Sequence, residues 1–219
     1  MPAETTTEAV QIPTGEVSLA GDLTVPNSAL GLVVFAHGSG SSRFSERNRF
    51  VARSLQAAGL GTLLFDLLTG DEERIDAYTA ELRFDIDLLG QRLTAAVDWL
   101  QANPTIGGLG VGLFGASTGA AAALKAAAQR PGVVKAVVSR GGRPELAGDD
   151  LFRVRAPCLL LVGGLDGVVI ELNRTAADSL RVEHELIIVP GATHLFPEPG
   201  ALENVAERTR DWFLRLLPT

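Results

Sequence analysis

The chain has 219 residues, of which 46% are hydrophobic and 21% charged, and its formal net charge is −7. This length suits one domain with one large core, and the balance of apolar and charged residues excludes a disordered chain. The acidic charge, without a basic face, argues against a nucleic-acid-binding protein and against binding to an anionic membrane.

The N-terminal residues and the cysteine content bear on the compartment of the protein. Residues 1–15, MPAETTTEAVQIPTG, contain no basic residue and lack the apolar core of a signal peptide. No stretch of the sequence reaches the roughly 18 consecutive apolar residues that cross a bilayer. The single cysteine, Cys158, lies in an apolar run and cannot form an internal disulfide. We therefore expect a cytoplasmic protein with a flexible tail over 1–14 and one domain over 15–219.

The first predicted elements form the edge of a β-sheet. Segments 16–21 and 22–26 alternate apolar and polar residues, share a Gly-Asp junction and predict a hairpin. Mostly apolar runs rich in β-branched residues follow, a pattern typical of strands buried on both faces. These runs are GLVVFAHG (31–38), GTLLFD (61–66), LGVGLFG (109–115), VVKAVVS (133–139), CLLLVGG (158–164) and HELIIVPG (184–191).

Helical segments separate these apolar runs. Apolar residues spaced three and four apart predict helices over 45–59, 83–103, 117–130, 169–181 and 201–217. Strands that alternate with helices predict a single-domain α/β fold, with a mostly parallel sheet of about eight strands, helices on both faces and no large cap domain. Two longer connections, 67–81 and 140–157, follow strand ends, where open parallel sheets bind ligands.

Ser117 is the candidate nucleophile. It lies in GLFGASTG, between an apolar strand and an alanine-rich helix. In a G-x-S-x-G turn the serine occupies a sharp corner between strand and helix. Gly115 and Gly119 leave room for that corner because neither has a Cβ atom.

A serine hydroxyl needs a base within hydrogen-bond reach and a carboxylate that orients the base. Of the three histidines, His37 ends a predicted strand, His184 begins one, and His194 lies in a loop just beyond a strand. Asp166 directly follows a predicted strand and is the favoured acid. Asp66 also ends a strand and is the main alternative, although it precedes the serine and a capping role is commoner for such a residue.

The order Ser117, Asp166, His194, with each residue after a different strand, resembles the catalytic triad of the α/β-hydrolase family. The motifs AHGSGSS (36–42), LLFDLL (63–68), GLFGASTG (112–119), VGGLD (162–166) and GATHLF (191–196) are similar, more narrowly, to the small capless members of the dienelactone hydrolase-like group. The resemblance extends from about Glu16 to Leu217. The namesake enzymes carry a cysteine nucleophile, whereas this elbow carries serine, so the resemblance does not imply activity on dienelactone itself.

Backbone N–H groups are expected to stabilise the negative charge that develops on an attacked carbonyl oxygen. The N–H of Thr118 is one expected donor, because it begins the helix after the nucleophile. The resemblance places a second donor directly after a His-Gly pair, which is Ser39 here, with Gly40 as the alternative. His37 is expected to hold this loop by a hydrogen bond rather than to act as a base.

Several arginines are candidate substrate contacts. Arg43, Arg140 and Arg143 lie in loops beyond strand ends, where a guanidinium suits a substrate carboxylate or phosphate, and Gly40 is a further candidate contact. The alternative is that these are surface arginines without a role in binding. His37 with Asp66 lacks further ligands at metal-binding spacing, so no metal or other cofactor is expected.

The sequence thus predicts a serine hydrolase that cleaves small carboxylic esters or lactones through an acyl-enzyme on Ser117. Phosphotriester or thioester hydrolysis at the same site, acyl transfer to an alcohol and a non-catalytic binding protein on a hydrolase scaffold are the alternatives. The expected partner is a small-molecule substrate, and a homodimer is left open.

Overall fold

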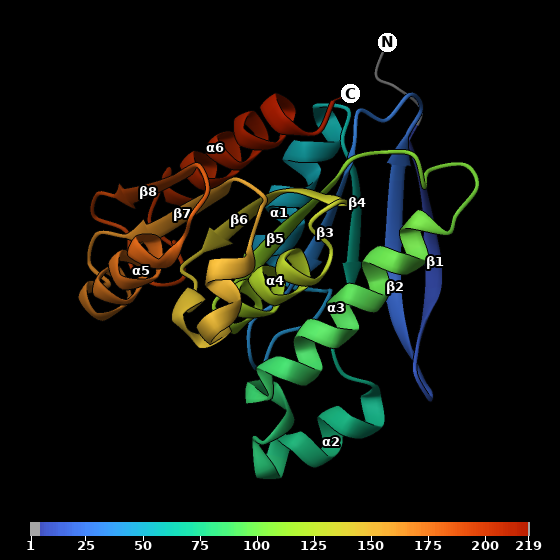
Figure 1. Cartoon of the computed structure of the whole chain (residues 1–219), viewed down its shortest axis with the longest axis horizontal. Coiled ribbons are helices and arrows are strands. Elements are labelled where there is room, and N and C mark those ends of the chain that lie inside the picture. The colour runs from blue at the N-terminus through green and yellow to red at the C-terminus, as the bar shows by residue number, and fades with distance from the viewer. Residues whose placement is uncertain (1–4, 219) are drawn as a thin grey trace.

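The computed structural model describes residues 5–218 and is built around one eight-stranded sheet in the order β1-β2-β4-β3-β5-β6-β7-β8 (Figure 1). The strands are β1 (Thr5–Thr14), β2 (Val17–Pro26), β3 (Leu32–Ala36), β4 (Gly61–Phe65), β5 (Val111–Ala116), β6 (Val134–Arg140), β7 (Cys158–Gly163) and β8 (His184–Val189). Strands β3 to β8 run parallel, and β1 and β2 form an antiparallel edge. The predicted single-domain α/β fold is confirmed.

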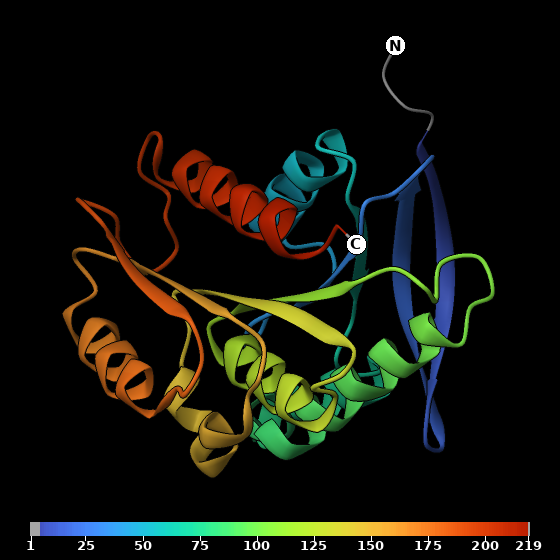
Figure 2. The same cartoon turned by 45° about the horizontal axis from the view of Figure 1, so that its top comes forward.

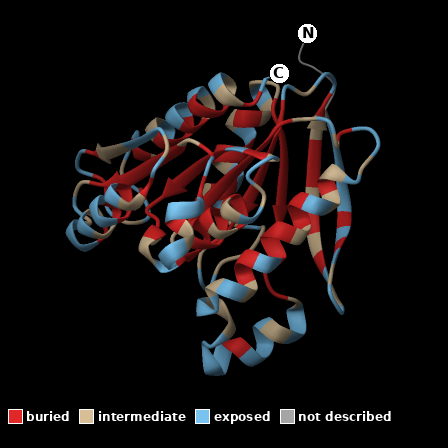
Figure 3. Ribbon diagram, in the orientation of Figure 1, coloured by how far each residue is buried: buried red, intermediate tan, exposed pale blue. Residues whose placement is uncertain are grey.

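Helices cover both faces of this sheet (Figure 2). One face packs against α3 (Ile86–Gln101), α4 (Thr118–Gln129) and α5 (Gly167–Ser179), and the other against α1 (Glu46–Ala57) and α6 (Ala201–Leu216). Strands β3, β4, β5 and β7 are buried along their whole length (Figure 3). Burial on both faces explains why these strands read as continuous apolar runs rather than as alternating ones.

The N-terminal edge differs from the prediction. Residues 5–14, expected to be a flexible tail, form β1, in which Val10 and Ile12 are buried, and residues 1–4 lie outside the described residues. The two segments predicted as a hairpin are one continuous strand, β2, and the turn of the hairpin lies instead between β1 and β2 at Gly15, with φ +61°. Gly21 serves close packing, because a Cβ atom there would lie 3.0 Å from the Cβ of Phe65.

The two long connections contain helical structure that the sequence analysis did not predict. Segment 67–81 holds α2 (Gly70–Thr79), which is followed by the short 3-10 helix η1 (Leu82–Phe84), and segment 140–157 holds the 3-10 segment η2 (Pro144–Arg153). Helix α2 extends away from the sheet (Figure 1). Its Ile75 and Tyr78 are exposed and its only buried residue is Asp76, so it has no buried apolar stripe by which the sequence could predict it. A capping box formed by Thr69 and Glu72 starts this helix.

Polar contacts attach α2 to the domain. The guanidinium of Arg92 in α3 donates to both carboxylate oxygens of Glu72, over 2.8 and 2.5 Å, and this hydrogen bonding lowers the pKa of Glu72. At the other end of α2, buried Asp76 accepts from the Nε of Arg83 over 2.5 Å. Across residues 5–218, no helix combines the length and apolar character needed to cross a membrane.

Candidate active site

Ser117 lies on a strained corner between β5 and α4. Its φ of 52° and ψ of −121° are unfavourable for a residue with a side chain, and such strain concentrates at functional sites. The two flanking glycines are required by packing. A Cβ on Gly115 would lie 2.4 Å from the Cα of Ala120, and one on Gly119 would lie 2.3 Å from the carbonyl oxygen of Ala36. The predicted strand-to-helix elbow is therefore present, with the serine only partly buried.

His194 and Asp166 form a direct pair at the neighbouring strand ends. Asp166 precedes α5 at its N-cap position, yet its side chain does not cap the helix. Its Oδ2 instead lies 2.6 Å from Nδ1 of His194, in the loop after β8. The histidine side chain is 39% exposed and the aspartate 18%, so the imidazole faces solvent while the carboxylate behind it is shielded. A carboxylate in this position holds the ring and leaves Nε2 free for proton transfer.

The segment after β6 links the serine to the histidine. The N–H of Ser117 donates to the carbonyl of Arg140 over 3.2 Å, and the N–H of Arg143 donates to the carbonyl of Ser117 over 3.0 Å. Between them, a Cβ on Gly141 would lie 3.6 Å from Cε1 of His194. Among the described side chains, Ser117 and His194 make no direct hydrogen bond to each other. Catalytic hydrogen bonds are often long in free enzymes and tighten when substrate binds.

The expected oxyanion donors have different surroundings. The N–H of Thr118 begins α4 and has no acceptor within residues 5–218, as expected for a donor held ready for an anion. The N–H of Ser39 was predicted as the second donor, but it already donates to Oγ1 of Thr118 over 2.9 Å. Gly40, the predicted alternative, has a φ of +67° that favours glycine.

His37 holds the loop that carries Ser39, as the sequence predicts. The ring is buried, its Nε2 accepts from the N–H of Leu67 over 3.0 Å, and its Nδ1 lies 3.0 Å from the carbonyl of Gly38. This pattern requires a neutral ring with the proton on Nδ1. Burial lowers the pKa of His37, which keeps the ring neutral.

Asp66, the alternative acid, pairs with Arg43 rather than with His194. One of its oxygens accepts from the N–H of Arg43 over 2.8 Å, and the other pairs with the guanidinium of Arg43. Asp66 therefore fixes the start of the segment that leads into α1, and His194 does not contact it. Arg43 was predicted as a substrate contact, and in the structure its guanidinium is paired with Asp66.

The other candidate groups also have defined surroundings. Arg143 pairs with Glu145 at 2.5 Å. Arg140 is 6% exposed, and burial together with the nearby charge of Arg47 lowers the pKa of Arg140 to about 10. Burial raises the pKa of Cys158 to about 12, so its thiol stays protonated and unreactive. Within residues 5–218, no group of three or more His, Cys, Asp or Glu side chains could hold a metal ion.

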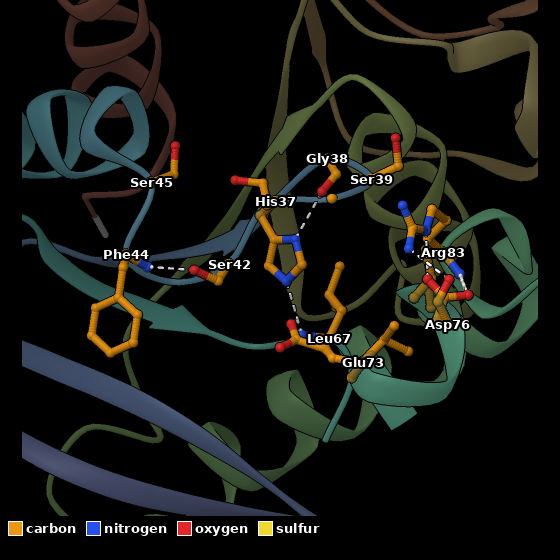
Figure 4. A pocket seen from close by; sticks show the side chains of 14 residues that line it. His37, Gly38, Ser39, Ser42, Phe44, Ser45, Leu67, Glu73, Asp76 and Arg83 are labelled. Carbon is orange, nitrogen blue, oxygen red and sulfur yellow. Dashed lines mark hydrogen bonds and ion pairs between the residues drawn. The ribbon is translucent and has the colours of Figure 1, made fainter. Parts of the chain in front are cut away.

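A cavity of about 490 Å³ lies at the loop that follows β3 (Figure 4), and Ser117, Asp166 and His194 are not among its lining residues. It is lined by the loop at residues 37–42, by Phe44, Ser45, Leu67, Leu68 and Leu89, and by Glu73, Asp76 and Arg83. Gly38 joins the cavity to the nucleophile, because a Cβ on Gly38 would lie 3.1 Å from the Cβ of Ser117.

Gly40 lines this cavity, and the arginine that lines it is Arg83 rather than Arg43 or Arg140. Arg83 was not nominated from the sequence, because this residue begins the helix predicted over 83–103 rather than a loop beyond a strand end; in the structure it lies in η1. Asp76 balances its charge, as the dashed contacts in Figure 4 show. The pKa of Glu73 is raised by burial and by the nearby carboxylate of Asp66, which favours the neutral form of this carboxyl group.

Known proteins share this fold. The model of the dienelactone hydrolase family matches residues 19–218. A crystal structure of a dienelactone hydrolase from Anabaena variabilis is 57% identical, with a TM-score of 0.96 over 97% of this chain and 99% of that chain. Est1E from Butyrivibrio proteoclasticus is 18% identical, with a TM-score of 0.79 over 94% of this chain and 98% of its own, and shares the fold.

Two relatives from strains of Mycobacterium tuberculosis are each 58% identical to this chain over 207 residues and are provisionally named phosphoribosyl transferases. The match covers 94% of this chain but 46% of each relative. The chain thus spans less than half the length of these relatives.

Proposed function

Because the chain belongs to the dienelactone hydrolase family, we propose that it is a serine hydrolase that cleaves small carboxylic esters or lactones. The observation that carries the proposal is the strained Ser117 elbow beside a 2.6 Å pair between His194 and Asp166. A backbone strained at one serine and an aspartate that caps no helix both favour a site maintained for chemistry.

The proposed reaction is acyl transfer in two steps. His194 removes the proton from Ser117 as Oγ attacks the substrate carbonyl, and the same proton then passes to the departing alkoxide as its bond to carbon breaks. The acyl-enzyme is hydrolysed when His194 takes a proton from water, the resulting hydroxide attacks the acyl carbon, and Ser117 recovers its proton. Asp166 orients the imidazole and stabilises its protonated form in both steps.

The cavity supports a small, uncharged substrate group. Its volume suits a compact acyl or alcohol group, and its walls combine apolar side chains with serine hydroxyls and backbone. Arg83, which lines the cavity, is paired with Asp76, and Arg43, beyond the loop at residues 37–42, is paired with Asp66. We therefore expect neutral esters to be better substrates than esters with a free carboxylate.

The transferase name of the mycobacterial relatives belongs to proteins more than twice as long as the matched region. The elbow and its histidine-aspartate pair lie within the matched family region of this chain. We therefore propose hydrolysis for this domain, whatever the remainder of those longer proteins does.

Turnover of a p-nitrophenyl ester series from acetate to decanoate tests the proposal. We expect the wild type to prefer short chains and Ser117→Ala to lose turnover. Ser18→Ala, on the exposed face of β2, is the matched control and should behave as the wild type. A lactone, a thioester and a phosphotriester complete the series. Equal turnover by the wild type and Ser117→Ala would refute the proposed nucleophile.

A further inference from the structure

The hydroxyl of Thr118 lies beside the proposed nucleophile, and the reaction proposed for Ser117, His194 and Asp166 gives this hydroxyl no role. Thr118 follows Ser117 directly, begins α4 and is 4% exposed. Its Oγ1 accepts the N–H of Ser39 over 2.9 Å, a bond between residues 79 positions apart in the chain. The bond therefore joins the loop after β3 to the first turn of α4, the two segments expected to surround an oxyanion.

This bond changes which donors are free beside the nucleophile. The N–H of Ser39 already donates to Oγ1 of Thr118. A hydroxyl that accepts one hydrogen bond through a lone pair keeps its own proton for another. No residue within 5–218 accepts that proton from Thr118. Thr118 thus offers its backbone N–H and its hydroxyl proton at a helix N-terminus, where the helix dipole favours an anion.

We propose that the hydroxyl of Thr118 is a donor of the oxyanion hole and that the N–H of Ser39 acts behind it. The inference rests on the proposed function, because the oxyanion forms when Ser117 attacks a carbonyl. The bond from Ser39 polarises the hydroxyl and strengthens the bond that the hydroxyl donates. It also holds the threonine in one rotamer, so the donor is in place before substrate arrives.

The surrounding backbone keeps this arrangement rigid. Gly38 lies so close to the elbow that a Cβ on it would be 3.1 Å from both the carbonyl oxygen of Ala116 and the Cβ of Ser117. On the other side, the loop is fixed by the buried ring of His37. Ser39 and Thr118 therefore meet between two anchored segments.

Two substitutions of Thr118 distinguish a role of its hydroxyl as a hydrogen-bond donor from a role of its side chain in packing. Thr118→Val keeps the shape and removes the hydroxyl, whereas Thr118→Ser keeps the hydroxyl. We expect Thr118→Val to lower kcat on short esters about 100-fold, the usual loss for one oxyanion donor, with little change in KM. Thr118→Ser should retain most of the wild-type kcat. Thr118→Ala gives the same comparison if the valine variant does not fold.

Labelling by a fluorophosphonate gives a second readout that needs no knowledge of the natural substrate. Oγ of Ser117 forms a bond to the phosphorus of the probe as the P–F bond breaks and fluoride leaves, His194 takes the hydroxyl proton, and the phosphoryl oxygen lies where the oxyanion would form. We expect Thr118→Val to be labelled about 100-fold more slowly than the wild type and Thr118→Ser at a similar rate to the wild type. Wild-type protein that is not labelled would contradict the proposed function itself. Rapid wild-type labelling with an equally rapid reaction of Thr118→Val would overturn only the role of the hydroxyl.

Discussion

Asp66 and Asp166 carry the same carboxylate and lie at comparable positions, each shortly after a parallel strand. Their neighbours give them different tasks. Asp66 receives the backbone N–H and guanidinium of Arg43, whereas Asp166 receives Nδ1 of His194. We expect Asp166→Asn to lower kcat by about 100- to 10,000-fold, because an amide holds the imidazole less well and does not stabilise its charged form. Asp66→Asn should disturb the Arg43 segment and leave kcat within a few-fold of the wild type. Steady-state kinetics on one ester checks both variants, and a larger loss in Asp66→Asn would reverse the assignment.

The candidate residues Ser117, His194 and Asp166 could be nominated from the sequence, by their order and their places after strands. The sequence could not show that the N–H of Ser39 is occupied, because that depends on one hydroxyl from a residue 79 positions away.

The ends of β3 and β4 are joined through one buried side chain, His37, which bonds to Gly38 and Leu67. Burial lowers the pKa of His37 in the folded protein, so the unfolded chain binds this proton more readily. The free energy of unfolding should therefore fall as pH decreases through the range where the unfolded histidine becomes protonated, by up to about 1.4 kcal/mol per pH unit from this one group. Urea unfolding between pH 7.5 and 5.5 measures this slope, which should be shallower in His37→Gln although that variant is less stable at pH 7.5. Parallel slopes in the two proteins would contradict the coupling of His37 protonation to unfolding.

Among the elements, the parallel strands and their helices were predictable, since burial on both faces leaves a continuous apolar run in the sequence. The polar helix α2 was not, because its stability comes from a capping box and the contacts of Glu72 and Asp76 rather than from an apolar stripe. The prediction placed the hairpin turn at Gly21, because a glycine needed for close packing against Phe65 cannot be told from a turn glycine by sequence alone.

Across the whole molecule, the scaffold places a strained serine, an exposed imidazole and a cavity at the same edge of the sheet. The fold agrees with a crystal structure of a dienelactone hydrolase at a TM-score of 0.96, which fixes the architecture more firmly than the substrate. The proposed hydrolase requires Ser117 to be an activated nucleophile. Peptide mapping by mass spectrometry after fluorophosphonate treatment identifies the residue that reacts. We expect one label per chain, on the peptide that contains Ser117, and no label in Ser117→Ala. A label on another residue, or no label on the wild type, would refute this role of Ser117.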